Sequence, residues 1–171
     1  MDLAALIRDI PDFPEPGVVF KDITPVLADA KALAQLVDSL SEPFTDAGVS
    51  KVAGIEARGF TLATPVAGHL SAGFIPLRKP GKLPFDTVTE EYELEYGTDA
   101  LEVHVDAVTD GEKVLLVDDV IATGGTAAAA IRLLRRIGAD VVGLSVFIEL
   151  AFLGGSDHLD GVPLHALLRY D

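Results

Sequence analysis

The segment Val114–Thr126, VLLVDDVIATGGT, places two adjacent aspartates between an apolar run and a Thr-Gly-Gly-Thr turn. The run 113–119 (KVLLVDD) is apolar without alternation, which is typical of a parallel strand covered on both faces. Residues 125–137 then show apolar side chains at helical spacing. We therefore expect a strand, a glycine turn and a helix in succession, with Asp118 and Asp119 at the carboxyl end of the strand.

Outward from this segment, apolar runs alternate with segments of helical periodicity. We expect strands over 51–57, 72–78, 113–119 and 140–148, β-type runs over 91–96 and 100–106, and helices over 3–8, 30–47, 60–71 and 125–137. Proline content predicts a loop at 11–17, a mobile loop at 79–90 and an early end of the second helix at Pro43. Residues 58–60 are expected to form a turn. Strands that alternate with helices predict an α/β fold with a parallel sheet, in a single domain over residues 1–171.

Composition limits the classes of function. The chain has 171 residues, 49% of them hydrophobic, no cysteine and a net charge of -14. A nucleic-acid binder would need a basic face, and a membrane span would need ~20 consecutive apolar residues. The first residues lack the basic start and cleavage site of a secretory signal. We expect a cytoplasmic protein whose acids coat its surface, and adaptation to high salt remains an alternative.

The glycine turn and the aspartates predict a binding site. Ligands of open α/β sheets bind beyond the carboxyl ends of the strands. A Gly-Gly turn lets backbone N–H groups converge, a helix N-terminus favours an anion, and Thr123 and Thr126 add hydroxyl donors, so the turn suits a phosphate. Asp118 and Asp119 cannot bind that phosphate and are suited to hydroxyls or a metal, and a ribose diol fits both descriptions. The alternative, that the two aspartates only cap the helix, is weaker because Thr123 is better placed to cap.

VLLVDDVIATGGT resembles the phosphoribosyl diphosphate (PRPP) signature of the type I phosphoribosyltransferases. The resemblance implies that Asp118 and Asp119 hold the ribose hydroxyls. It places the 5′-phosphate on Ala122, Thr123, Gly124, Gly125 and Thr126. It also implies the fold of that family, with a small N-terminal hood at about 1–27 and a flexible lid loop at about 79–93.

Five other segments are similar to the adenine phosphoribosyltransferases. They are PGVVFKDITPVL (16–27), GIEARGF (54–60), LRKPGKLP (77–84), EEYELEYGTDALEVH (90–104) and IEL (148–150). The similarity runs from about Ile7 to Gly155 and implies purine salvage, in which adenine and PRPP give AMP and diphosphate. It implies Mg²⁺ bound through PRPP, with no direct protein ligand expected, and a homodimer in which a partner loop helps to complete the site.

The same resemblance assigns roles to further residues. It places diphosphate on Ala57, Arg58, Arg78 and Lys82, adenine on Val19 and Phe20, and the lid on Lys79 and Tyr96. The peptide near Ala57 is expected to take an unusual conformation and to donate backbone hydrogen bonds. Arg58 and Glu95 are the implied catalytic residues, with Glu95 as general acid/base. One departure from the family pattern is Phe85, where glycine is common, and residues 156–171 match weakly and carry no expected site.

Each of these residues has a plainer alternative. Arg58 would be an exposed loop arginine, the basic cluster at 78–82 a solvated surface, Glu95 a surface acid and Phe20 a core residue.

Two other functions compete with adenine transfer. A nucleotide-sensing regulator that binds nucleic acid would be expected to show a basic face and an eroded lid, whereas this chain is acidic and keeps RKPGKLP. A transferase for another base, such as orotate, would need extra cations near the base, and the hood offers only Lys21. No lysine follows Lys113, whereas relatives acting on 6-oxopurines use a later lysine, so adenine is favoured.

Overall fold

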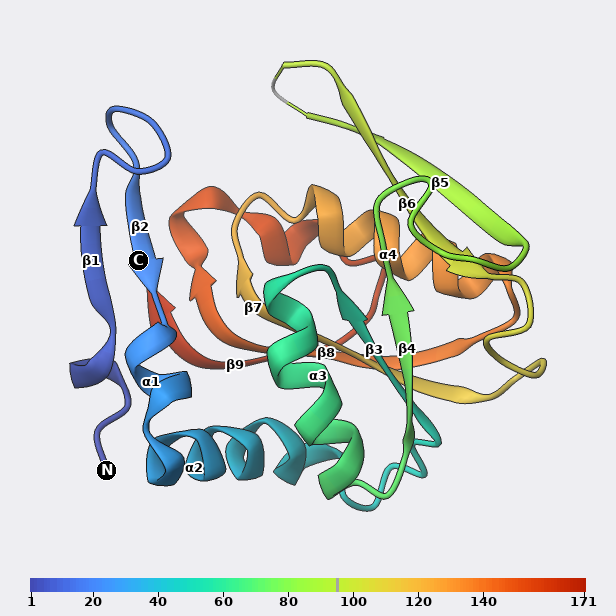
Figure 1. Ribbon diagram of the computed structural model, residues 1–171, viewed down its shortest axis with the longest axis horizontal. Helices are drawn as coiled ribbons and strands as arrows, with labels where there is room; N and C mark the ends of the chain where they lie inside the picture. The colour runs from blue at the N-terminus through green and yellow to red at the C-terminus, as the bar shows by residue number, and fades with distance from the viewer. Residues whose placement is uncertain (95) are drawn as a thin grey trace.

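A five-stranded parallel sheet forms the centre of the protein (Figure 1). The computed structural model describes residues 1–94 and 96–171. The strand order is β4-β3-β7-β8-β9, and every neighbouring pair is parallel. The strands are β3 (Lys51–Ile55), β4 (Gly73–Leu77), β7 (Lys113–Ile121), β8 (Asp140–Leu150) and β9 (Leu164–Tyr170). The predicted α/β fold with a parallel sheet is confirmed.

Helices cover both faces of the sheet and bury two apolar clusters. Helices α2 (Ala30–Ser41) and α3 (Arg58–His69) pack on one face. Helix α4 (Gly125–Arg136) packs on the other face, together with the antiparallel hairpin of β5 (Thr87–Glu93) and β6 (Thr98–His104). Among the described residues, no helix has both the length and the apolar character needed to cross a bilayer.

The N-terminal residues form a second hairpin beside β9 (Figure 1). It pairs β1 (Arg8–Pro11) with β2 (Val19–Asp22), and the short helix α1 (Thr24–Ala28) follows it. The Lys21 ammonium lies 4.2 Å from the centre of the Tyr170 ring, which connects the hairpin to the end of β9. Single 3₁₀ turns complete the chain at Ala4–Leu6, Glu42–Phe44, Ala151–Leu153 and Gly155–His158.

Several predicted boundaries were wrong. Helix α3 begins at Arg58, so the turn expected at 58–60 is its first turn. Strand β7 continues to Ile121, two residues past the predicted end at 119, so the aspartates are not its last residues. The loop expected to reach residue 90 ends earlier, because β5 begins at Thr87. Helix α2 ends at Ser41, before the proline as expected.

The sheet order creates a crevice between β3 and β7. From β3 the chain passes to β4 on one side, and it later returns to β7 on the other side. The helices that follow β3 and β7 therefore leave toward opposite faces of the sheet, α3 on one and α4 on the other. The carboxyl ends of β3 and β7 flank a topological switch point, where open α/β sheets bind ligands.

Gly54 of β3 allows α3 to lie close to the sheet. A Cβ on Gly54 would come within 2.6 Å of the Ala63 Cβ and 3.2 Å of the Gly59 carbonyl. The Gly59 carbonyl belongs to the backbone of α3, so it can move away from an added methyl group only if the start of the helix, including Arg58, moves with it.

We expect Gly54→Ala to lower the free energy of unfolding by about 1–3 kcal/mol, because the added methyl group overpacks this contact. Urea unfolding of both proteins measures the difference. The matched control is Gly68→Ala in α3, where no atom lies within 4 Å of the added methyl group. That variant should gain up to about 1 kcal/mol. Equal stability of Gly54→Ala and the unmodified protein would contradict the close-packing account.

Candidate active site

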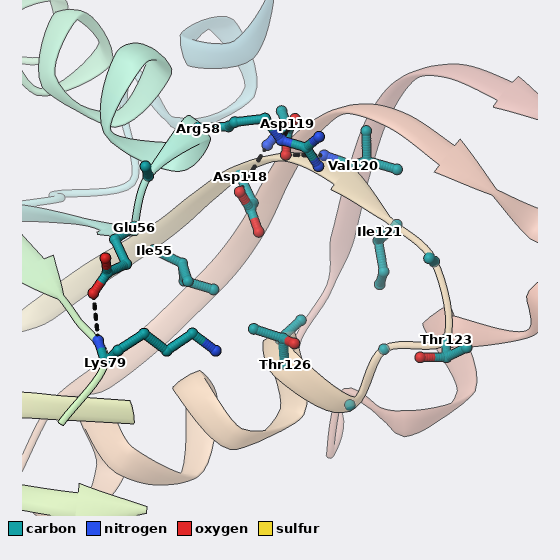
Figure 2. A pocket seen from close by; sticks show the side chains of 15 residues that line it. Ile55, Glu56, Arg58, Lys79, Asp118, Asp119, Val120, Ile121, Thr123 and Thr126 are labelled. Carbon is teal, nitrogen blue, oxygen red and sulfur yellow. Dashed lines mark hydrogen bonds and ion pairs between the residues drawn. The ribbon is translucent and has the colours of Figure 1, made fainter. Parts of the chain in front are cut away.

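A polar cavity of about 280 Å³ lies at the switch point (Figure 2). Two segments build most of its wall, 55–58 after β3 and 118–127 at the end of β7, and Lys79 completes it. The site residues predicted on β7 and on the glycine turn are thus brought together with Ala57 and Arg58.

The glycine turn approaches a second loop closely. Gly124 has a φ of 85°, in the left-handed region that favours glycine. A Cβ there would lie 2.4 Å from the Gly155 carbonyl, and a Cβ on Gly155 would lie 2.4 Å from the Ala122 carbonyl. Gly155 was not predicted as a site residue; the adjacent glycines at 154–155 are the sequence feature that could have indicated a close approach. Gly124 and Gly155 are therefore both needed for the two loops to approach this closely.

The N-terminus of α4 faces the cavity without a side-chain cap. Gly124 occupies the cap position, and among residues 1–94 and 96–171 no side chain accepts a hydrogen bond from the first turn of the helix. The alternative that the two aspartates cap the helix was wrong, and Thr123, which is better placed to do so, does not occupy the cap position either. The N–H groups of the first turn are therefore available to an anion.

The side chains of Asp118 and Asp119 point to opposite faces of β7, as those of neighbouring residues in a strand do. Asp118 points into the cavity (Figure 2), and its Oδ1 accepts a hydrogen bond of 2.9 Å from the Asp119 N–H. Burial and the adjacent Asp119 charge raise the pKa of Asp118 well above its ordinary value. Burial also raises the pKa of Asp119, although Arg58 opposes the shift.

Asp119 and Arg58 form an ion pair at the edge of the cavity. The Asp119 side chain is buried, and its Oδ2 lies 2.7 Å from Arg58 Nε. Within the described part of the chain, that oxygen accepts no hydrogen bond. The Arg58 charge compensates this oxygen, which can still accept a hydrogen bond from a ligand.

Arg58 also separates the polar cavity from an apolar one. Its guanidinium carbon lies 4.8 Å from the centre of the Phe20 ring. A second cavity of about 160 Å³ lies there, lined by Val18, Val19, Phe20, Lys21, Arg58, Val120, Ala122 and Leu150. The two cavities share Arg58, Val120 and Ala122. The structure therefore places the residues predicted for the base beside those predicted for the sugar phosphate.

The basic residues expected on diphosphate are held by acids. Lys82 Nζ lies 2.9 Å from a Glu56 oxygen, and Arg78 Nε lies 3.6 Å from the other. Burial opposes ionisation of Glu56, but the hydrogen bonds from Lys82 and the Lys79 amide lower its pKa. Of the lid residues 78–82, only Lys79 lines the polar cavity. The peptide between Glu56 and Ala57 is cis, which is an unusual conformation, as expected there.

The remaining predicted residues lie on the lid and its hairpin. Tyr96 is 88% exposed, and Phe85 packs edge-on against His104 with ring centres 6.1 Å apart. Glu95 lies outside the described residues. No group of three or more histidine, aspartate or glutamate side chains that could hold a metal ion occurs in residues 1–94 and 96–171.

Known phosphoribosyltransferases are similar to this protein over nearly the whole chain. Residues 21–157 match the family profile described as phosphoribosyl transferase domain. A relative from Thermobifida fusca, named adenine phosphoribosyltransferase, is 58% identical over 161 residues, covering 94% of this chain and 92% of that protein.

Solved structures of adenine phosphoribosyltransferases superpose closely. The one from Rhodothermus marinus is 53% identical, with a TM-score of 0.94 and coverage of 98% of this chain and 96% of the other. The one from Saccharomyces cerevisiae, solved with adenine and an imino-altritol bisphosphate, is 36% identical, with a TM-score of 0.93 and coverage of 98% and 97%. With its crevice and glycine turn in place, the chain belongs to the phosphoribosyltransferases, and among them to the adenine phosphoribosyltransferase family.

Proposed function

We propose that this protein transfers the 5-phosphoribosyl group from PRPP to adenine, giving AMP and diphosphate in purine salvage. The observation that carries the proposal is the pair of adjoining cavities. The polar cavity suits a sugar phosphate and the apolar one suits a flat base, and the two share Arg58, Val120 and Ala122. The bond that forms between base and sugar would lie where the cavities meet.

In this proposal the glycine turn binds the 5′-phosphate. The uncapped first turn of α4 offers N–H donors, and Thr123 and Thr126 add hydroxyls. Asp118 and Asp119 accept hydrogen bonds from the ribose hydroxyls. The Asp119 oxygen that lacks a donor in the described chain supports this role, since a ribose hydroxyl would supply one.

Diphosphate leaves toward the segment after β3. Ala57 and Arg58 line the cavity there, and Arg78 and Lys82 lie next to it on Glu56. Cations and N–H groups fixed in advance stabilise the charge that develops on the leaving group. The transition state should resemble a ribosyl oxocarbenium ion. Lys79 and Tyr96 would belong to a lid that excludes water.

Mg²⁺ would be bound through the oxygens of PRPP and through water, with no direct protein ligand, which fits the reluctance of this ion to lose its hydration shell. Bound Mg²⁺ would neutralise charge on the diphosphate. A homodimer and a cytoplasmic location are also part of the proposal.

The contacts of Lys21 favour adenine over an acidic base such as orotate as the substrate. Its ammonium lies 2.7 Å from Asp9 and against the Tyr170 ring, so it is already paired. A carboxylate in the apolar cavity would therefore find little free positive charge.

A panel of bases assayed with PRPP and Mg²⁺ tests the proposed function. We expect AMP and diphosphate from adenine, with kcat/KM at least about 100-fold lower for guanine, hypoxanthine and orotate, because the cavity must match the hydrogen-bonding edge of the base. Conversion of guanine or hypoxanthine with adenine ignored would contradict the proposal. A protein that binds PRPP without turnover would instead support the nucleotide-sensing alternative.

Asp118→Asn should reduce kcat/KM for PRPP by about 10- to 100-fold, the value of a hydrogen bond to a charged group. The same change should stabilise the fold at pH 7 by about 1–3 kcal/mol, because it removes a charge whose ionisation burial opposes.

The direction of the pKa shift of Asp118 determines how the stability difference between the two proteins depends on pH. The pKa of Asp118 is raised in the folded state, so its ionisation destabilises the fold as pH rises above about 4, the unfolded value. The gain from Asn should therefore be absent below that pH and grow toward pH 7. Thermal unfolding between pH 3 and 8 measures it, with the exposed Asp46→Asn as control. A variant that loses both activity and stability at pH 7 would argue against this account.

Glu95→Gln should lower kcat about 100-fold or more with little change in KM, since a positioned general acid/base contributes on this scale. Steady-state kinetics with adenine and PRPP measure both constants. Glu93→Gln, an exposed acid at the end of β5, is the control. A change confined to KM would mean that Glu95 positions substrate and moves no proton.

A further inference from the structure

Lys79 extends along the wall of the polar cavity. Its backbone N–H donates to the Glu56 carboxylate, which fixes the start of the side chain beside the segment after β3. The side chain then runs toward Thr126 at the glycine turn (Figure 2). Its ammonium thus lies between the proposed diphosphate and 5′-phosphate positions.

The Lys79 ammonium is bound by two residues of the β5–β6 hairpin. It donates to the Asp99 carboxylate and, at 3.1 Å, to the Tyr92 hydroxyl. Tyr92 and Asp99 face each other across the hairpin. Asp99 shares the inward face with Leu101 and Val103, which are fully buried. An acid therefore occupies a position on a face that is otherwise apolar along β6.

Both members of the pair are charged. The hydrogen bond from Lys79 lowers the pKa of Asp99, against the effect of burial. Partial burial would lower the pKa of Lys79, but the bonds to Asp99 and Tyr92 raise it. The contact is therefore an ion pair at neutral pH, with about a third of each side chain exposed.

Asp99 differs from the acids that hold the other cations. Asp119, which pairs with Arg58, and Glu56, which pairs with Lys82, both line the polar cavity. Asp99 is outside the described lining of that cavity. Its negative charge therefore acts on a bound anion mainly through Lys79.

We propose that Asp99 is a competing anion for Lys79, which holds the ammonium while the cavity is free and thereby weakens the binding of PRPP and of product diphosphate. When a phosphoryl group binds, the ammonium exchanges a carboxylate oxygen for a phosphate oxygen, and the exchange is reversed when diphosphate leaves. No covalent bond changes in this exchange. The inference rests on the proposed function and assigns Asp99 as a positioning residue that acts through Lys79.

The test is the affinity for inorganic diphosphate with Mg²⁺, measured by calorimetry on the full chain. We expect Asp99→Asn to bind diphosphate about fivefold more tightly, the upper value of a partly exposed ion pair. KM for PRPP should fall by a similar factor. Asp99→Ser, which also removes the carboxylate, should change affinity in the same direction. A purely structural role would instead weaken binding.

Two matched variants identify the cause. Asp106→Asn removes one exposed negative charge from the segment after β6 and should leave diphosphate affinity unchanged. In a Lys79→Gln background, Asp99→Asn should have no effect, because the lysine that transmits its charge is gone. Thermal unfolding of each variant confirms that it is folded before binding is measured.

Three results would overturn the role of Asp99 alone. The first is weaker or unchanged diphosphate binding by Asp99→Asn. The second is an equal gain in affinity in Asp106→Asn, and the third is a gain that persists in the Lys79→Gln background. If the unmodified protein forms AMP in any of these cases, the proposed function stands and only the role of Asp99 falls. If the unmodified protein neither binds diphosphate nor forms AMP, both the proposed function and the role of Asp99 are overturned.

Discussion

The pairing of β3 with β7 is the constraint on which the site depends. Gly54 faces Val117 across this pair, so the segment after β3 and the end of β7 reach the same edge of the sheet. Because the following helices leave on opposite faces, their N-termini open a crevice and do not fill it. The close contact of Gly54 with α3 then sets how far Arg58 stands from Asp119. A shift of one strand would separate the glycine turn from the residues proposed for diphosphate.

An anion site in a chain of net charge -14 requires local control of charge. The glycine turn, where we propose that phosphate binds, obtains its positive potential from N–H groups, which carry no net charge. The four basic residues around the crevice are each opposed by an acid: Arg58 by Asp119, Lys79 by Asp99, and Arg78 and Lys82 by Glu56. Three acids thus balance all but one of these four positive charges, and an entering anion would compete with them for the cations.

The sequence predicted the parts of the site whose chemistry is local. The run KVLLVDD and the glycine turn specified a buried strand and a helix start, and both are present. Strand β9 was missed because its half-buried residues show neither a fully apolar run nor clean alternation. The Asp99–Lys79 pair was missed for a different reason. It joins residues twenty positions apart through the fold of a hairpin, and periodicity within either segment carries no sign of it.

The two phosphate positions differ in what the reaction asks of them. The 5′-phosphate is present in both PRPP and AMP, so its contacts do not need to break during transfer. Neutral N–H donors of a glycine turn suit this demand, because within the described chain no acid accepts a hydrogen bond from them. Diphosphate is bound at first and must leave, so its contacts have to be strong in the transition state and reversible afterwards. Cations that already have a carboxylate partner within reach meet both demands, since each lost contact with diphosphate is replaced by one with the protein. If diphosphate binds as proposed, Glu56 and Asp99 belong to its position as much as the cations that they hold.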